Sequence, residues 1–335
     1  MPLRQGLTRL LLPLERVVDR RRTARRQGAV PVIDPYLGYA TPDHVILRGR
    51  VLTALRRTEP DPRGHWFGNL RQMLSLFLTD EVAGVTVTAG DHSAVTDEEG
   101  YFQLPLPRPA QAAGWREEHV TPPGGAPQAL EALVPEPGAR FAVVSDIDDT
   151  VLHTGAHTLW TNLRTSLTGN ALTREVYPDA VALLTALAAG GNPVFYVSSS
   201  PWNLHHFLQR IMARHGVPKG PMFLRDYGLD EAQFITGTHG DHKGSALDVL
   251  MGAMPDLSFV LIGDTGQHDP QVYGAAIERH PGRVALVILR QAGRADDPAD
   301  TQAIEAIRAA GVPVRSVADY SGLPDDPELA GWLTP

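Results

Sequence analysis

From about residue 138 to its C-terminus, the chain alternates continuous apolar runs of strand length with amphipathic segments of helix length. The apolar runs are FAVVSD, NPVFYVSSS, LSFVLIGD and RVALVILR. Strands that lack polar alternation are buried on both faces, and helices between them supply the long crossovers that parallel pairing requires. We therefore predict an α/β domain over residues 138–335, with a Rossmann-like parallel sheet that carries helices on both faces.

The preceding region, residues 29–137, has the pattern of a β-domain. HVILRGRVLT and GVTVTAG contain alternating β-branched residues, and AVTDEEGYFQLPLP reads as strand, turn and strand, with Gly100 able to adopt positive φ. These runs predict a small β-sandwich, and GVTVTAGDHSAVTDEEGYFQLPLP resembles transthyretin-like or carboxypeptidase-regulatory domains. The Pro- and Gly-rich stretch 121–130 predicts a loop or linker near the domain boundary.

Residues 1–28 form a basic arm, in which eight arginines face only Glu15 and Asp19. Leucine and valine recur in it at helical spacing, which predicts an amphipathic helix. Such a stripe can pack on its own domain and leave the arginines in solvent, or it can lie on an anionic membrane surface. Both interpretations stay open, and nucleic acid is not the partner we expect.

The chain contains no cysteine, which excludes disulfides, thiolate zinc sites and cysteine nucleophiles. A reducing compartment fits this composition. No apolar stretch approaches the roughly 20 residues that a membrane-spanning helix needs. We expect a cytoplasmic protein. Peripheral membrane association through the basic arm stays an open alternative.

Three aspartates, Asp146, Asp148 and Asp149, follow directly on the first apolar run of the α/β region. Another aspartate, Asp264, ends a later apolar run, and the carboxyl ends of parallel strands meet at one edge of a sheet. Clustered carboxylates repel one another unless a cation neutralises them, and oxygen ligands suit Mg²⁺. The pattern therefore predicts a magnesium site at that edge.

The order of four motifs resembles that of the haloacid dehalogenase-like phosphohydrolases. DIDDT (146–150) resembles the D-x-D-x-T motif, and FYVSSSPWN, HK (242–243) and IGDTGQHD resemble the second, third and fourth motifs. SDIDDTV, VSSSPWNL, FLRDYG and IGDTGQHDP together resemble the phosphatidate phosphatase catalytic-domain family, related to the yeast actin-patch-associated enzyme. The resemblance implies a HAD-like fold, and the spacing of the motifs leaves no room for a large cap domain.

The resemblance implies roles for the acidic residues. Asp146 would be the nucleophile that forms an aspartyl-phosphate, and Asp148 the general acid and base. The Mg²⁺ site would comprise Asp146, Asp148 through its backbone carbonyl, and Asp264. Asp269 would lie beside it and orient Lys243 or a metal-bound water.

The resemblance also implies which residues contact the phosphoryl group. Lys243 would stabilise its negative charge together with that of the nucleophile. Ser198 is the hydroxyl we expect to bind the phosphoryl oxygen, with Ser199 and Ser200 as open alternatives because a shift of one residue would exchange them. Thr150 would fix the loop of the site by hydrogen bonding.

These assignments predict a Mg²⁺-dependent phosphatase whose best-fitting substrate is phosphatidate, converted to diacylglycerol, or a related phospholipid. A site without a large cap is accessible to bulky phosphomonoesters. Phosphoproteins, nucleotides and polynucleotide ends are therefore the alternative substrates. A third interpretation is a membrane or partner adaptor whose catalytic domain is vestigial.

Overall fold

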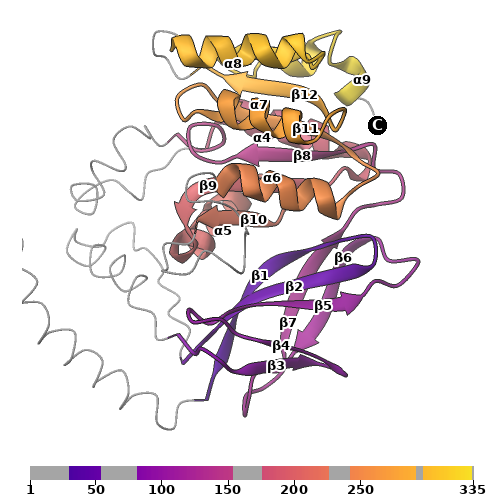
Figure 1. Ribbon diagram of the computed structural model, residues 1–335, viewed down its shortest axis with the longest axis vertical. Coiled ribbons are helices and arrows are strands. Elements are labelled where there is room, and N and C mark those ends of the chain that lie inside the picture. The colour runs from indigo at the N-terminus through magenta and orange to yellow at the C-terminus, as the bar shows by residue number, and fades with distance from the viewer. Residues whose placement is uncertain (1–29, 54–80, 154–175, 226–241, 292–296, 334–335) are drawn as a thin grey trace, which may run out of the picture.

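The computed structural model describes residues 30–53, 81–153, 176–225, 242–291 and 297–333. Its described residues up to 134 form a β region, and those from 141 onward form an α/β region (Figure 1). The basic arm lies outside the described residues, so its helix and its membrane contact stay predictions. No helix within the described ranges is both long and apolar enough to cross a bilayer.

Six parallel strands form the sheet of the α/β region, in the order β10-β9-β8-β11-β12-β13. They are β8 (Phe141–Asp146), β9 (Val194–Pro201), β10 (Met222–Arg225), β11 (Ser258–Asp264), β12 (Val284–Arg290) and β13 (Val314–Val317). The chain enters at β8, builds outward to β10, and then crosses to β11 on the other side of β8. This reversal between β8 and β11 is where open parallel sheets form ligand sites.

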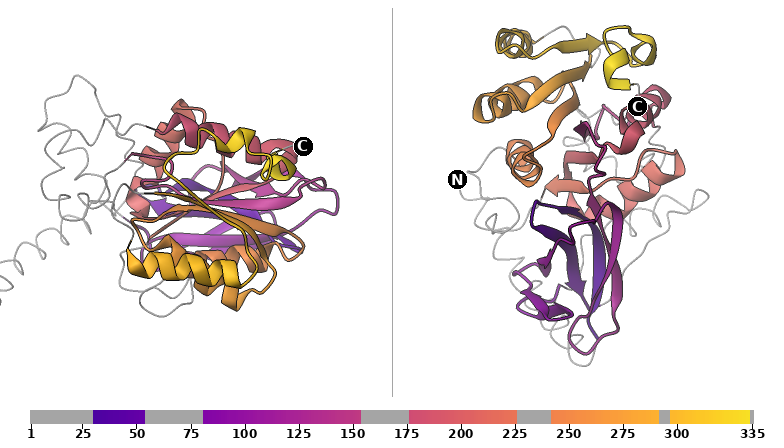
Figure 2. Two further views of the ribbon diagram at one scale, coloured as in Figure 1. Left: turned by 90° about the horizontal axis from the view of Figure 1, so that it is seen from above. Right: turned by 90° about the vertical axis from the view of Figure 1, so that its right-hand side faces the viewer.

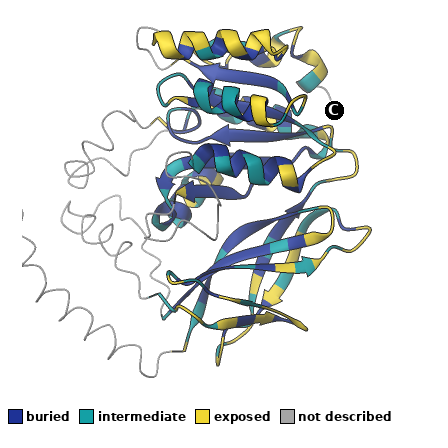
Figure 3. Ribbon diagram, viewed as in Figure 1, coloured by how far each residue is buried: buried dark blue, intermediate teal, exposed yellow. Residues whose placement is uncertain are grey.

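Helices cover both faces of this sheet, which confirms the predicted architecture (Figure 2). One face carries α4 (Pro178–Ala188), α5 (His205–Arg214) and the short α9 (Ala330–Leu333), and the other carries α6 (His242–Ala253), α7 (Asp269–Arg279) and α8 (Pro298–Ala309). Successive strand side chains point to opposite faces, so Val143 packs in the α4 and α5 layer while Val144 packs in the α6 and α7 layer. The central strands are therefore buried along their length (Figure 3).

The β region contains a five-stranded sheet in the order β5-β2-β1-β7-β6 and a separate hairpin of β3 and β4. The strands are β1 (Val32–Ala40), β2 (His44–Leu52), β3 (Thr86–Ala89), β4 (His92–Val95), β5 (Tyr101–Pro107), β6 (Gly114–Val120) and β7 (Gln128–Val134). Val87 and Ala89 of the hairpin share a core with Leu47 and Leu104 of the larger sheet. The predicted small β-domain is thus present, and its resemblance to transthyretin-like domains stays a prediction.

The Pro- and Gly-rich stretch 121–130 is a loop over most of its length, as one of the two expected alternatives had it, and it is not the linker between the regions. Residues 121–127 connect β6 to β7 inside the β region, and the rest of the stretch belongs to β7. The connection between the two regions is the short segment 135–140. A turn-rich composition marks hairpin loops as readily as linkers, so composition alone left both alternatives open.

The two regions share their hydrophobic cores. Tyr36 and Tyr101 of the β region belong to the cluster that contains Val143, and Tyr39 and Leu133 belong to the cluster on the other face of the parallel sheet. The five-stranded sheet therefore has its own core on one face and the α/β region on the other.

His205 is a buried imidazole at this junction, with its ring centroid 4.6 Å from that of Tyr36 and 1% of its surface exposed. Burial, followed by the charges of His206 and Arg48, lowers its pKa well below the ordinary value. As pH falls below about 6.5, the unfolded chain binds a proton that the folded protein excludes, so stability is lost. We expect His205→Gln to reduce this loss, measured as thermal unfolding at about pH 7.5 and about pH 5.5.

The same substitution at His215, which is exposed, is the matched control and should leave the pH dependence unchanged. A wild-type slope retained in His205→Gln would contradict the expectation.

Candidate active site

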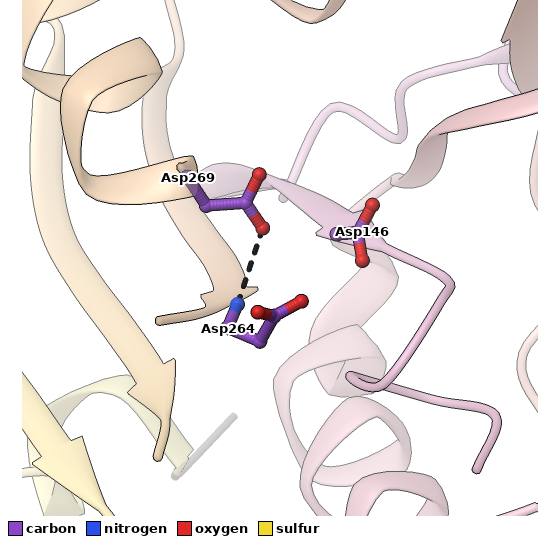
Figure 4. Close-up of side chains that lie close together, drawn as sticks. All are labelled: Asp146, Asp264 and Asp269. Carbon is purple, nitrogen blue, oxygen red and sulfur yellow. Dashed lines mark hydrogen bonds between the residues drawn. The ribbon is translucent and has the colours of Figure 1, made fainter. Parts of the chain in front are cut away.

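Two aspartates from adjacent strands meet at the carboxyl edge of the sheet. Asp146 ends β8 and Asp264 ends β11, and these strands pair in register up to Ser145 and Ile262. Asp269, at the start of α7, lies beside them (Figure 4). Carboxylate oxygens of the three residues lie within 4.8 Å of one another, and all three side chains are buried. The strand register thus brings together the acids that the motifs single out.

Lys243 is the cation of this cluster. It lies in the first turn of α6, is buried, and places Nζ 2.8 Å from Asp146 Oδ1 and in contact with Asp269 Oδ1. Burial alone would lower its pKa, but Asp146 and Asp269 outweigh burial and hold the pKa above its ordinary value. Lys243 is therefore a fixed positive charge between two carboxylates.

Both oxygens of Asp269 are engaged by protein donors. Oδ1 contacts Lys243, and Oδ2 accepts a hydrogen bond of 3.1 Å from the Asp264 backbone N–H (Figure 4). Gly263 permits this approach, since a Cβ there would lie 2.4 Å from Asp269 Oδ2. The orienting role expected for Asp269 stays a prediction, and both of its oxygens already have a protein partner.

The loop after β8 returns the Asp148 carboxylate toward β9. Val151 and Leu152 both donate backbone hydrogen bonds to the Ile147 carbonyl, and Asp149 donates to the Leu152 carbonyl at 2.8 Å. Asp149 adopts φ 58°, a left-handed conformation that aspartate tolerates better than most residues. The tight loop buries Asp148 within reach of the end of β9.

Two of the three candidate serines contact Asp148. Ser198 Oγ and Ser200 Oγ donate to Asp148 Oδ2 at 2.7 and 2.9 Å, and the Ser200 backbone N–H donates to Ser198 Oγ at 2.9 Å. Residues two apart on a strand share a face, so Ser199 lies on the other side and is partly exposed. The structure therefore groups Ser198 and Ser200 together with the predicted general acid.

Gln267 is a site residue that sequence reasoning missed. It occupies a variable position of the fourth motif, and its Nε2 donates to the backbone carbonyl of Asp148 at 2.7 Å. Thr150 departs from its expected role, because its hydroxyl is buried and has no hydrogen-bond partner among the described residues. The backbone bonds of the loop, rather than the Thr150 hydroxyl, hold its shape there.

Lys243 offsets only part of the negative charge that these buried acids would carry when ionised. Burial raises the pKa of Asp146 well above its ordinary value, and Asp269, Asp264 and Asp148 add to the rise against the effect of Lys243. Burial and then Asp269 raise the pKa of Asp264 to about 8. Asp146 Oδ2 and Asp264 Oδ2 accept no hydrogen bond within the described part of the chain. A hard divalent cation fits this set of oxygen atoms.

We expect cation binding to release protons. At pH 7 the Asp264 carboxyl, with a pKa of about 8, holds a proton that a metal ion must displace. Because this folded-state pKa lies above the unfolded one, the contribution of Asp264 to the stability of the metal-free protein declines as pH rises from about 4 to about 8. Titration calorimetry with Mg²⁺ in buffers of different ionisation enthalpy should show proton release at pH 7 and less at pH 9.

Asp264→Asn should bind Mg²⁺ more weakly and release fewer protons than the wild type. Binding without proton release at pH 7 would show that the carboxyl is already ionised in the free protein.

The positions of these side chains define the class of the protein. An acid at the end of β8, hydroxyls at the end of β9, a lysine opening α6 and acids after β11 make a haloacid dehalogenase-like catalytic domain. Residues 141–291 match the family model described as phosphatidate phosphatase APP1, catalytic domain.

Two curated yeast proteins are similar to part of the chain. Phosphatidate phosphatase APP1 of Saccharomyces cerevisiae is 29% identical over 155 residues, which is 45% of this chain and 26% of that protein. An uncharacterized protein of Schizosaccharomyces pombe is 30% identical over 160 residues, 45% of this chain and 25% of that protein. The chain thus spans about a quarter of the length of these relatives.

Solved structures give weaker matches. A Mesorhizobium loti protein assigned to the HAD-like phosphatases aligns at a TM-score of 0.33 and 14% identity, covering 61% of this chain and 98% of its own. A chain of a Pnkp1/Rnl/Hen1 complex aligns at 0.33 and 13% identity, covering 48% and 49%. At these scores the alignments carry no argument about this chain.

Proposed function

We propose that this protein is a Mg²⁺-dependent phosphatase that hydrolyses a phosphomonoester, with phosphatidate or a related phospholipid as its substrate. The observation that carries the proposal is the convergence at one sheet edge of a buried acid cluster, its lysine and a hydroxyl-bound second acid. These residues are Asp146, Asp264, Asp269, Lys243 and Asp148. The match of residues 141–291 to the family model described as phosphatidate phosphatase APP1, catalytic domain, supports the same chemistry.

Asp146 and Asp264, with the backbone carbonyl of Asp148, would hold Mg²⁺. When bound, the ion supplies positive charge that offsets the carboxylates and the phosphoryl oxygens. The orphaned Oδ2 atoms of Asp146 and Asp264 support this assignment.

Asp146 is the proposed nucleophile. Its carboxylate forms a bond to phosphorus as the bond from phosphorus to the alcohol oxygen breaks, which leaves an aspartyl-phosphate. Lys243, 2.8 Å from Asp146 Oδ1, favours the ionised carboxylate and lies where it can stabilise the added phosphoryl charge.

Asp148 is the proposed acid and base. Its proton passes to the leaving alcohol oxygen, and its carboxylate then takes a proton from the water that attacks the aspartyl-phosphate. The hydroxyls of Ser198 and Ser200 fix the orientation of this carboxyl, since both donate to Oδ2. In the substrate-free protein, the geometry supports a role for both serines in orienting Asp148. Ser198 is also expected to contact the phosphoryl group of a bound substrate.

The lipid substrate rests on the family name and on the motif spacing, which leaves no large cap. Phosphate release should be measured on phosphatidate in vesicles, a phosphopeptide, a nucleotide and a phosphorylated oligonucleotide, each with Mg²⁺ and with EDTA. We expect release from phosphatidate, in Mg²⁺ only.

Preferential phosphate release from the phosphopeptide or from either nucleic-acid substrate would overturn the assignment of a lipid substrate. The proposed phosphatase chemistry would then still hold. Binding to anionic vesicles, measured by co-sedimentation, with no release from any substrate would overturn the enzymatic proposal in favour of an adaptor.

A further inference from the structure

Trp202 links the β region to the serines of the candidate site. It follows β9 directly, two positions after Ser200, and its side chain is buried. Its ring is stacked on that of Tyr36 with centroids 4.7 Å apart, and it lies 6.2 Å from the ring of Tyr101. Both tyrosines belong to the β region, on β1 and β5. The segment that carries the serines is thus held by side chains from outside the α/β region.

Arg48 of β2 strengthens this contact. It is 1% exposed, and its guanidinium lies 4.5 Å from the ring centroid of Phe223 and 5.6 Å from that of Trp202. It donates to the Leu37 carbonyl within the β region and, at 3.0 Å, to the Met222 carbonyl of β10. One side chain thereby connects β1 to β10 at defined backbone atoms.

The register of β10 carries this constraint to the serines. Met222 pairs with Tyr196 of β9, and Leu224 pairs with Ser198. Beyond Ser198 the register shifts, so that Arg225 pairs with Pro201, directly before Trp202. A buried guanidinium costs free energy, and its hydrogen bonds to carbonyls are directional. Apolar contacts alone would be enough to hold the two regions together. The hydrogen bonds of Arg48 also fix the position of β10, and of β9 beside it, relative to the β region.

We infer that Tyr36, Tyr101 and Arg48, which we call the clamp, act as positioning residues for catalysis by holding Trp202 and the end of β9. The serines at that end both donate to Asp148 Oδ2, so the clamp sets the orientation of the proposed general acid. The β region then contributes to catalysis by positioning residues of the α/β region. This inference rests on the proposed function and adds residues that the catalytic motifs do not contain.

The proposed role of Asp148 as general acid predicts a dependence of kcat/KM on the substrate that a general loss of structure would not produce. A general acid matters most when the leaving group is a poor one, such as the alcohol of phosphatidate. p-Nitrophenolate leaves without protonation, so hydrolysis of p-nitrophenyl phosphate depends little on the acid. Because kcat/KM reports the steps through departure of the leaving group, its ratio between the two substrates measures how well Asp148 is placed.

The test compares the full chain with Tyr36→Leu and Trp202→Phe, using soluble dioctanoyl phosphatidate and p-nitrophenyl phosphate in Mg²⁺. A general acid contributes about 10²–10⁴-fold. We expect its partial misplacement to lower kcat/KM on the lipid by about 10-fold or more, and by less than about 3-fold on p-nitrophenyl phosphate. Asp148→Asn is the positive control for this signature.

Leu133→Ala is the matched control, because Leu133 of β7 also packs at the junction, in the cluster on the other face of the parallel sheet from Tyr36 and Trp202. Its substrate ratio should equal that of the wild type. Thermal unfolding establishes that each variant is folded, and Trp202→Phe, which keeps an aromatic ring, carries the test where Tyr36→Leu does not fold. Equal losses on both substrates, or no loss, in an active wild-type background would overturn the clamp alone. An inactive wild type would overturn the proposed function and the clamp with it.

Discussion

Asp146→Asn is expected to lower phosphate release by about 10⁴-fold or more, since removal of a nucleophile leaves only the binding contributions of the site. The amide keeps the shape of the carboxyl and cannot form the aspartyl-phosphate. Initial rates on phosphatidate with Mg²⁺ measure the loss. Activity within a few-fold of the wild type would exclude Asp146 as the nucleophile.

The same variant is expected to be more stable than the wild type in the absence of metal. Burial and the neighbouring acids raise the pKa of Asp146, so its charge at neutral pH disfavours the folded state. The amide removes that charge and leaves Lys243 its contact with Asp269. Thermal unfolding with EDTA should therefore show a higher midpoint for Asp146→Asn, and addition of Mg²⁺ should stabilise the wild type more than the variant.

Asp149→Asn is the matched control for both measurements. Asp149 lies three positions after Asp146, occupies the variable position of DIDDT, and adopts a positive φ that asparagine also tolerates. We expect activity within a few-fold of the wild type and no gain in metal-free stability from this change.

Lys243→Met is expected to cause the largest loss of stability, about 3–5 kcal/mol in the free energy of unfolding at neutral pH. The apolar side chain has a similar length but leaves Asp146 and Asp269 buried without their cation. Urea unfolding with EDTA at about pH 7.5 measures the effect. The loss should be smaller at about pH 5.5, because the raised pKa of Asp146 and that of Asp264 favour protonation there.

Lys219→Met is the matched control for Lys243→Met. Lys219 Nζ lies 2.6 Å from Glu131 Oε1, but both side chains are well exposed. Surface ion pairs of this kind contribute less than about 1 kcal/mol to the free energy of unfolding. Equal losses in the two variants would show that Lys243 does not stand between uncompensated buried carboxylates. Catalysis by Lys243→Met should also fall, since the phosphoryl charge then lacks its fixed cation.

Much of the α/β region was predictable because its signals are local. Apolar runs such as FAVVSD mark buried strands, and the helices between them require parallel pairing. Parallel strands place their carboxyl ends at one edge, so Asp146 and Asp264 had to lie on the same side of the sheet. Their adjacency needed one further fact, that β11 pairs directly with β8.

The choice among the serines shows where local reasoning ended. Ser198, Ser199 and Ser200 follow one another at the end of an apolar run. The sequence therefore does not show which of their hydroxyls points into the site. The loop after β8 brings Asp148 to the face that Ser198 and Ser200 share, which separates them from Ser199. Gln267 was missed for a similar reason, since only the packing of the fourth motif against the first shows its bond to Asp148.

What the amino-acid order determined about this protein is the layer architecture, the motif order and the identity of the acids and lysine, because periodicity and strand ends are properties of short segments. Only the tertiary structure decided that residues 121–127 connect two strands, that Thr150 lacks a hydrogen-bond partner among the described residues, and that Tyr36 and Arg48 reach Trp202. These contacts join segments that are distant in the chain. They depend on strand register and on the packing of one region against the other, which no local pattern encodes.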